Sequence, residues 1–426
     1  MPGTHRVDRT WWSIGLGVAF LLTSRLALAE APPQGWSQFL GPNRNGVSSE
    51  TGLIDTFAPK GPKVAWRVRG GTGMSGIAVD HNKAVTMLER DGEQAVVAFR
   101  VTDGSELWSQ PLSAGFRNPM GAGPRATPTI AAGSVFVFTG EGILAALDEN
   151  TGNVQWQHAV IADFEGDPAE YGMACSPLVV DGLVIVSAGV PGASVVAYET
   201  NGGKLAWKTG DDTAGYSSPA LLTVGGRRQV VAFTGKAAIG LEPKTGAPLW
   251  RYEYTTDFDC NIATPIAVGN DVFISSGENH GCALLSLKPQ GDGFQVTEVW
   301  KSFGPTSVMR NEWQTSILLD GHLYGMDNVG GAGPVTHLNC VNAKTGQRVW
   351  QKTRFGKGNL IAADGKLYIV TLDGSLVIVR ATPERFEELS RAKVFEGTRQ
   401  APALLDGKLY LRDQTEVLCV DLRATK

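Results

Sequence analysis

One stretch decides the fold, and it reads ALDENTGNVQW at residues 146–156. Related stretches occupy residues 98–108, 197–207, 240–250 and 340–350, and each of them ends in Trp. Trp300 ends a degenerate copy whose turn, Gly291-Asp292-Gly293, lies farther from the Trp. Counted from Trp66, these tryptophans recur at intervals of 42 to 51 residues. A regular period of that length indicates a repeat architecture.

The order of residue types within the stretch indicates how the chain runs locally. A small residue such as Ala146 ends one strand, and a Thr-Gly or Asp-Gly pair then reverses the chain, because Gly accepts a positive φ. The next strand carries the Trp, which can pack between neighbouring sheets and point its N–H at a backbone carbonyl. Repeats of four short strands are typical of propeller blades. We therefore predict that seven tryptophans are structural docking residues, namely Trp66, Trp108, Trp156, Trp207, Trp250, Trp300 and Trp350.

A second pattern counts the blades. A Ser/Thr-Pro pair, or a pair in the equivalent place, precedes an apolar run eight times, where the innermost strand of each blade should begin. These pairs start at residues 75, 127, 176, 218, 264, 315, 360 and 401. The seventh repeat, about residues 360–395, has no Trp, and we expect Phe395 to fill that position. The count predicts an all-β, eight-bladed propeller over residues 63–423.

The two ends of the repeat region each hold part of one blade. The strand Lys63-Val64-Ala65-Trp66-Arg67-Val68 has no companion strands before it. The last repeat, within residues 401–422, has three strands and no Trp strand. We expect these segments to pair into one four-stranded antiparallel blade, because shared closure removes an open sheet edge that would favour aggregation.

Residues 1–29 match a secretory signal peptide. Arg6 and Arg9 give a positive start, residues 11–23 are mostly apolar, and Ala27-Leu28-Ala29 fits the cleavage pattern. We expect a periplasmic or secreted protein without a membrane span after cleavage, with an uncleaved anchor as the alternative. Residues 30–62 should form a strap along the outside of the fold, pinned by Trp36 and Phe39.

Composition and cysteine usage narrow the function classes further. The 426 residues carry a net charge of −4 without a basic cluster, which argues against a nucleic-acid partner.

The five cysteines cannot all pair, and no CxxC occurs. Cys340 and Cys419 occupy the small-residue slot of the repeat, which favours buried packing. Cys175, Cys260 and Cys282 are left open as disulfide candidates.

The tryptophan repeats resemble the PQQ-like β-propeller repeat of quinoprotein type. The stretch from Trp36 to Ser48 also resembles the opening of secreted planctomycete-type members. This resemblance implies one of two activities. In quinoprotein dehydrogenases the fold holds pyrroloquinoline quinone (PQQ) and calcium and oxidises alcohols or sugars. In the propeller lipoprotein of the outer-membrane barrel-assembly machine it is a binding scaffold without catalysis.

The dehydrogenase branch has features that this sequence lacks. The sequence has no vicinal Cys-Cys pair, no CxxCH haem site and no long cap insertions. Motifs of other enzyme classes, HExxH of metalloproteases and GxSxG of serine hydrolases, are also missing. We therefore expect a scaffold with no catalytic residue and no cofactor. A PQQ- and calcium-dependent oxidoreductase of an alcohol or sugar is the alternative. Calcium would require oxygen ligands, for which Asp259, Asn261 and Glu312 are the candidates.

The segments just ahead of the inner strands should converge on the propeller axis. They mix cations, amides and aromatic residues, which suits a protein, peptide or glycan ligand at an axial funnel or on the loops. An ordinary polar channel mouth is the plainer alternative, and the acidic loop at 161–173 is a second place for partner contacts. We expect a monomer that binds an envelope partner. The funnel candidates are Arg125, Tyr216, Asn261, Arg310, Glu312, Trp313, Asn359 and Arg399.

Overall fold

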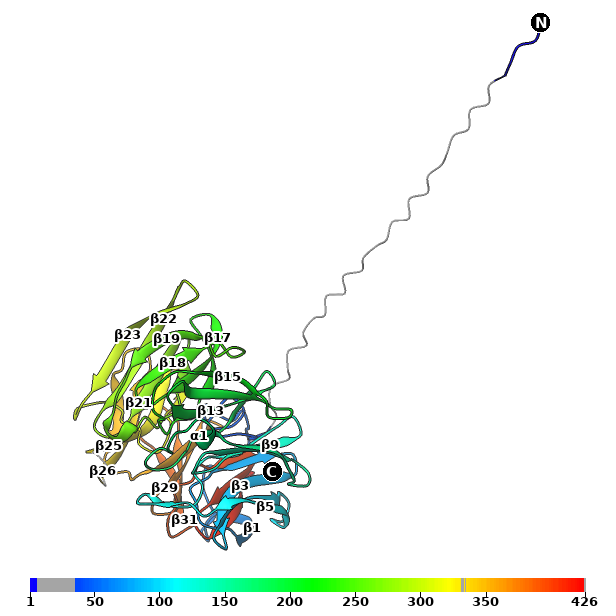
Figure 1. The fold of residues 1–426 in the computed structure, drawn as a ribbon. Coiled ribbons are helices and arrows are strands. Elements are labelled where there is room, and N and C mark those ends of the chain that lie inside the picture. The colour runs from blue at the N-terminus through cyan, green and yellow to red at the C-terminus, as the bar shows by residue number, and fades with distance from the viewer. Residues whose placement is uncertain (6–34, 331–332, 334, 425–426) are drawn as a thin grey trace. The chain divides into compact units, whose positions relative to one another are not determined.

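The computed structural model describes residues 1–5, 35–330, 333 and 335–424 (Figure 1). The chain divides into two units, residues 1–32 and residues 33–426, and all described strands belong to the second. The predicted signal peptide falls mainly on residues 6–29, which lie outside the described residues. Over the described ranges, no helix has both the length and the apolar character needed to cross a bilayer.

The second unit is built from eight four-stranded antiparallel sheets, which confirms the predicted eight blades. The innermost strands of neighbouring blades contact one another around the axis. From the innermost strand outward, blades 1 to 4 consist of β2 (Ile77–Asp80), β3 (Lys83–Arg90), β4 (Glu93–Arg100), β5 (Glu106–Ala114); β8 (Thr129–Ala131), β9 (Ser134–Phe138), β10 (Ile143–Asp148), β11 (Val154–Ala159); β12 (Leu178–Val180), β13 (Leu183–Val190), β14 (Ala193–Glu199), β15 (Leu205–Thr209); and β16 (Ala220–Val224), β17 (Arg227–Phe233), β18 (Ala237–Leu241), β19 (Pro248–Glu253).

The second half of the ring repeats this arrangement. Outside the blades, the described residues form only a few short secondary-structure elements. A small hairpin pairs β6 (Arg117–Asn118) with β7 (Gly121–Ala122), and the helical elements are α1 (Val160–Asp163) and the 3-10 turn η1 (Asp257–Asp259). Blades 5 to 8 consist of β20 (Ile266–Val268), β21 (Asp271–Ser276), β22 (Gly281–Gln290), β23 (Gly293–Phe303); β24 (Ile317–Leu319), β25 (His322–Val329), β26 (Val335–Asn342), β27 (Arg348–Lys352); β28 (Gly358–Ala363), β29 (Lys366–Thr371), β30 (Ser375–Arg380), β31 (Glu388–Lys393); and β32 (Ala403–Leu405), β33 (Lys408–Arg412), β34 (Glu416–Asp421), β1 (Lys63–Arg69).

The two ends of the repeat region share blade 8, as predicted. The blue strand β1 lies beside the red C-terminal strands (Figure 1), and it pairs antiparallel with β34. The pairing runs from Lys63 opposite Asp421 to Arg69 opposite Glu416. The Lys63 ammonium also lies 2.9 Å from the Asp421 carboxylate, so backbone pairing and an ion pair both close the ring.

Most junctions between neighbouring blades have the same geometry, which comes from the repeated Trp. In six junctions the indole N–H donates to a carbonyl in the turn between the third and fourth strands of the next blade, over 2.9 to 3.2 Å. Trp207, for example, donates to Pro243 O at 3.0 Å. Gly246 of the same turn has a φ of +69°, and a Cβ there would overlap the Trp207 ring. The turn glycine is therefore needed both for the reversal and for the close approach of the ring.

Trp250 is the exception among the seven tryptophans. Its N–H donates to the side chain of Gln229 in its own blade, over 2.5 Å, rather than to the next blade. Blade 5 has no turn of the usual length to receive it, because β22 and β23 extend into a longer hairpin around Gly291. The longer hairpin in the degenerate copy that ends at Trp300 therefore changes the hydrogen bonding of Trp250 at the junction between blades 4 and 5.

The expectation for Phe395 is wrong. The docking Trp faces the small residue of the third strand, as Trp156 faces Ala146, and in blade 7 the same register places Ser390 opposite Ile378. Phe395 lies beyond the end of β31 and is buried in the core near blade 8. Blade 8 offers no turn to a Trp at this point, since its third and fourth strands come from opposite ends of the chain.

The strap, here residues 35–62, lies across one end of the axis instead of along the outside of the fold. Its backbone bonds to the inner strands of blades 1, 2 and 7 through Trp36, Ser37 and Val47, and Leu53 pairs with Arg423 after blade 8. Leu53 N–H also donates to Asp364, and Glu50 accepts from the Gly407 turn. These turns join first and second strands, so the strap covers the end of the propeller where those turns lie.

All five cysteines are buried free thiols, so Cys175, Cys260 and Cys282 form no bridge among themselves. Cys340 stands opposite Trp350 and Cys419 opposite Trp66, which is the small-residue slot expected from the sequence.

Candidate functional site

A cavity of about 370 Å³ lies on the axis, and it opens at the end opposite the strap. In an antiparallel blade, the segment leading into the innermost strand and the turn between the second and third strands lie at the same end. These loops surround the cavity. Six of the eight funnel candidates lie in its wall, namely Arg125, Tyr216, Glu312, Trp313, Asn359 and Arg399.

The strap forms the floor of the cavity. Phe39 belongs to the lining, and Arg44 is only 3% exposed below it. The Arg44 guanidinium donates to carbonyls of Ser176, Pro177 and Pro219, at the start of two inner strands. Burial lowers the pKa of Arg44 to about 10, so the group is still charged at neutral pH. The cavity is therefore blind, with its mouth among the loops.

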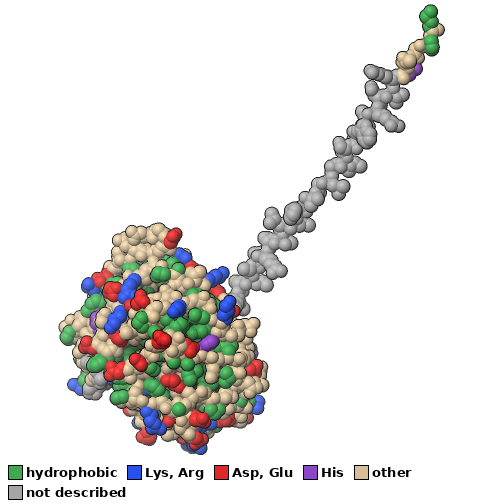
Figure 2. Space-filling model, in the orientation of Figure 1, with side chains coloured by type: hydrophobic (Ala, Val, Ile, Leu, Met, Phe, Trp, Pro, Cys, Tyr) green, Lys and Arg blue, Asp and Glu red, His purple; other side chains and the backbone are tan. Residues whose placement is uncertain are grey.

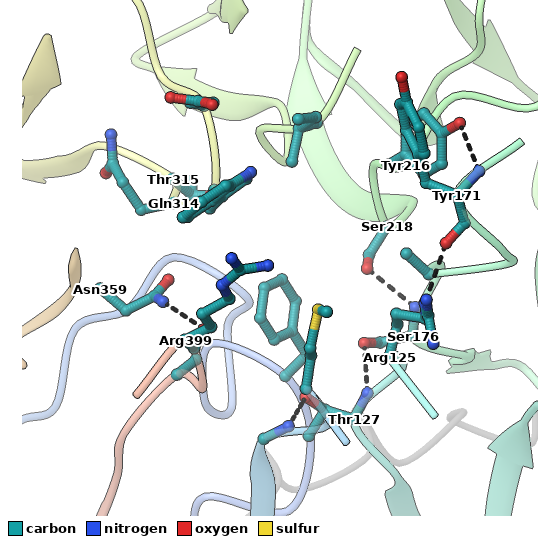
Figure 3. Close-up of a pocket in the computed structure, with 18 of the residues that line it drawn as sticks. Arg125, Thr127, Tyr171, Ser176, Tyr216, Ser218, Gln314, Thr315, Asn359 and Arg399 are labelled. Atoms are coloured by element: carbon teal, nitrogen blue, oxygen red, sulfur yellow. Dashed lines mark hydrogen bonds between the residues drawn. The ribbon is translucent and has the colours of Figure 1, made fainter. Parts of the chain in front are cut away.

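The lower wall is a set of hydroxyls that link neighbouring blades. The Oγ1 of Thr127 accepts from Gly76 N at 3.1 Å, Ser176 Oγ from Thr127 N at 3.0 Å, and Ser218 Oγ from Ser176 N at 2.9 Å (Figure 3). The Ser and Thr of the Ser/Thr-Pro pairs thus hold the inner strands together. Each of these hydroxyls accepts one hydrogen bond from the fold, which leaves its O–H for other contacts.

One side of the mouth is aromatic. Tyr171 and Tyr216 stack with ring centroids 5.7 Å apart, and Phe258 lies 6.3 Å from Tyr171. Phe258 is 60% exposed and has a φ of 58°, a left-handed backbone conformation that disfavours residues with a Cβ. Strained backbone conformations cluster at binding and active sites, which makes Phe258 a candidate contact residue.

The other side of the space presents Arg399 and Asn359 (Figure 3). Arg399 Cζ lies 4.6 Å from the Trp313 ring centroid, and Lys357 Nζ lies 4.4 Å from the same centroid. Lys357 also pairs with Glu312 at 2.7 Å. Burial raises the pKa of Glu312, while the Lys357 ammonium opposes that shift.

Two side chains in the wall have polar groups that the described part of the chain does not satisfy. Arg399 donates from Nη1 to Met120 O at 3.0 Å, but its Nε and Nη2 have no acceptor there. Gln314 is 4% exposed, and its Oε1 has no hydrogen-bond partner although its Nε2 donates to Met326 O. This oxygen has almost no accessible surface, so of the two side chains only Arg399 offers open hydrogen-bonding groups to the cavity.

Arg125 is committed to the loop that frames the mouth. Its guanidinium donates to the carbonyls of Tyr171, Gly121 and Gly123 and to Asn118 Oδ1. Burial lowers its pKa to about 10, again leaving a cation at neutral pH. Arg125 therefore positions the hairpin of β6 and β7 beside the cavity and contributes charge, with few N–H groups left for a ligand.

Two funnel candidates do not lie in the cavity wall. Asn261 is buried, and its amide donates to Thr234 O at 2.7 Å and to Tyr254 O at 2.9 Å, which holds the loop before blade 5. Arg310 makes a buried, bidentate pair with Asp327 over 2.7 and 3.0 Å. Both side chains support the fold near the mouth.

The oxygen donors proposed for calcium do not fit a metal site. Asp259 pairs with Lys236 at 2.6 Å and Glu312 with Lys357 at 2.7 Å, while Asn261 Oδ1 accepts from two hydroxyls, those of Thr256 and Ser276. A shared ion would have to displace two ammonium groups. Over the described residues, no group of three or more His, Cys, Asp and Glu could hold a metal.

Sequence reasoning missed several residues of the wall, namely Phe39, Met74, Met120, Phe258, Cys260 and Glu278. Glu278 lies in the turn between the second and third strands of blade 5, which reaches the same end of the blade as the segments before the inner strands but carries no repeated sequence pattern. Phe39 belongs to the strap, whose path across the axis leaves no periodic signal in the sequence.

The face drawn in Figure 2 shows no large patch of a single charge among the described residues. On the face drawn in Figure 2, acidic, basic and apolar side chains are interspersed. This distribution agrees with the small net charge of −4.

Comparisons with known sequences point to one family. A family model described as outer membrane protein assembly factor BamB matches residues 50–168 and 121–352. The outer membrane protein assembly factor BamB of Shewanella oneidensis is 25% identical over 387 residues, which cover 84% of this chain and 88% of that protein. The ER membrane protein complex subunit 1 of Gallus gallus is 30% identical over 107 residues, 25% of this chain and 10% of that protein.

Solved structures share the fold. Quinohemoprotein alcohol dehydrogenase from Comamonas testosteroni aligns with a TM-score of 0.68 at 14% identity, over 93% of this chain and 82% of that chain. BamB from Moraxella catarrhalis aligns with a TM-score of 0.60 at 16% identity, over 84% of this chain and 97% of that chain. An assembly factor and a dehydrogenase thus share this architecture, so function must be argued from the site.

Proposed function

The chain belongs to the family of outer membrane protein assembly factor BamB, whose model covers well over half of it, and we propose that it is a non-catalytic scaffold of the cell envelope that binds a protein or peptide ligand at the mouth of its axial cavity. The Shewanella oneidensis relative is named as an assembly factor for outer membrane proteins, which supports a protein ligand. The N-terminal sequence pattern supports the periplasm as the compartment.

One observation carries this proposal, namely the blind cavity with an aromatic mouth. Its volume of about 370 Å³ lies in the range of small binding pockets. Tyr171, Tyr216 and Phe258 present rigid aromatic surface at its mouth, and such residues dominate binding energy at protein interfaces. The proposal includes no reaction, because the donor set at the axis does not fit calcium and the wall contains no nucleophile paired with a base.

Site-specific photo-crosslinking tests where a partner binds. A photo-reactive phenylalanine analogue is placed at Phe258 in the mouth, or at Val154, an exposed apolar residue on the outer strand of blade 2. In intact envelopes we expect position 258 to crosslink a defined envelope protein and position 154 to give no such product. Crosslinking of the same protein from position 154 alone would move the binding site to the rim of the ring and contradict the proposal.

A further inference from the structure

The floor of the cavity restricts what can enter it. Phe39 and Arg44 of the strap close the end opposite the mouth, so an extended chain cannot pass through the ring. A chain end, a side chain, a loop tip or a small molecule can enter a space of about 370 Å³ that is closed at one end. From this shape and the groups below we infer that the cavity binds a carboxylate joined to an apolar or aromatic body, as the C-terminal residue of a peptide presents it. The inference rests on the proposed function and names the ligand end that the site would recognise.

Arg399 is the group that would receive the carboxylate. Its Nη1 is held by Met120 O at 3.0 Å and its guanidinium lies 4.6 Å from the Trp313 ring centroid, so its orientation is fixed before a ligand arrives. The Nε and Nη2 groups have no acceptor in the described part of the chain and extend into the space shown in Figure 3. A planar guanidinium with two adjacent N–H groups matches a carboxylate in a bidentate pair.

The apolar body of the ligand has a matching wall. Tyr171 and Tyr216 stack across the space from Arg399 (Figure 3), and Phe258 extends this surface toward solvent. Met74 and Met120 supply adaptable apolar contacts in the same cavity. An aromatic or large aliphatic side chain would bury its surface there while the carboxylate reaches Arg399.

The remaining charges allow an anion on the Arg399 side. Glu312 is neutralised by Lys357 at 2.7 Å, whereas the cation of Arg125 lies beside Tyr171 on the aromatic side. Glu278 acts electrostatically on Lys357 and Glu312 as well as on Tyr171 and Cys260, so this carboxylate is not confined to the aromatic side of the cavity.

Paired peptides test the inference on the full chain. A fluorescent heptapeptide ending in Phe is compared as its free acid and as its C-terminal amide, by anisotropy at constant salt. We expect the acid to bind at least 10-fold more tightly, which is the scale of one charge-assisted hydrogen-bond pair. N-acetyl-phenylalanine separates the two sources of this chemistry. Equal affinity for it would identify a free aromatic acid as the ligand, and weaker affinity would identify a peptide end.

Variants assign the effect to the named residues. Arg399→Gln should weaken binding of the acid at least 10-fold and leave the amide unchanged, whereas Arg385→Gln, at an exposed arginine of blade 7, should change neither. Arg399→Lys keeps the charge but lacks the planar guanidinium with two adjacent N–H groups, so it should give an intermediate loss of affinity for the acid. This variant replaces Arg399→Gln as the test if Arg399→Gln does not fold. Equal affinity of acid and amide, no binding of either at 1 mM, or discrimination that survives in Arg399→Gln would each overturn the inference. If position 258 still crosslinks an envelope protein, any of these results would contradict only the recognition of a carboxylate. The proposed function as a binding scaffold would remain.

Discussion

The framework of the propeller and the mouth of its cavity use the same residue types in opposite ways. In the framework, Trp207 donates to Pro243 and packs on Gly246, and Arg310 forms both hydrogen bonds to Asp327. At the mouth, Trp313 stacks with two cations and Arg399 has N–H groups without an acceptor among the described residues. Polar and aromatic groups satisfied by their own chain maintain the fold, whereas those left open at the mouth are available to a ligand.

Two tryptophan variants should show the largest difference. Trp207→Ala removes a buried ring from a blade junction and should lower the free energy of unfolding by about 4 kcal/mol. Trp313→Ala should cost less than about 1 kcal/mol, because its ring is partly exposed at the cavity. Urea unfolding followed by circular dichroism measures both. Similar losses in the two variants would show that the mouth is part of the framework.

Two arginine variants come next in size. Arg310→Ala leaves the fully buried Asp327 without its bidentate partner and should cost about 3 kcal/mol. Arg399→Ala should cost less than about 1 kcal/mol, since Arg399 forms no ion pair with a carboxylate among the described residues and acts on Glu312 only at longer range. The double variant Arg310→Met with Asp327→Leu is the control, and it should recover most of the stability because neither charge is then buried alone. A double variant as unstable as Arg310→Ala would show that the loss does not come from an unpaired Asp327.

Phe258→Gly should separate stability from binding. Its left-handed backbone conformation costs a residue with a Cβ about 1 kcal/mol, which Gly avoids. The variant should therefore be as stable as the parent or up to about 1 kcal/mol more stable, while the affinity for the peptide falls. Thermal unfolding and peptide anisotropy measure the two quantities. A less stable variant would mean that the ring supports the fold and that its strain has no bearing on the site.

A pH comparison of two glutamates should give the smallest effect. Burial raises the pKa of Glu278 at the mouth, so its contribution to stability is present below the ordinary pKa of about 4.3 and is lost as the pH rises through the raised value. Glu278→Gln should then stabilise the protein at pH 7, by a few tenths of a kcal/mol, and not at pH 4.

Glu298, on a framework strand, is the matched control with the opposite sign. Hydrogen bonds from Lys301 and Tyr252 lower its pKa, so its contribution is present above the ordinary pKa and is lost as the pH falls through the lowered value. Glu298→Gln should destabilise at pH 7 and have no effect at pH 4, as measured by thermal unfolding. The same sign for both variants would contradict the assigned environments.

The sequence predicts the framework well because each blade repeats one local task. The Trp, the Thr-Gly turn and the Ser/Thr-Pro pair each connect a blade to a neighbouring blade in most of the repeats, so their spacing is visible along the chain. Phe395 was misplaced because blade 8 has no turn for a docking residue, which is a property of ring closure. The mouth is less predictable. Arg310 and Arg399 occupy similar places in the sequence, and only the fold shows that Arg310 has Asp327 as a partner.

The pairing of β1 with β34 has a consequence for how the protein folds. Lys63 meets Asp421 across almost the whole chain, and such non-local pairing is slow because a long loop must close first. During synthesis, seven blades can form while the edge of β34 does not yet exist and β1 has no neighbour. The final step therefore joins the earliest strand to the latest. Until it occurs, both unpaired edges are exposed to other chains, so the protein is most vulnerable to misassembly just before it is complete.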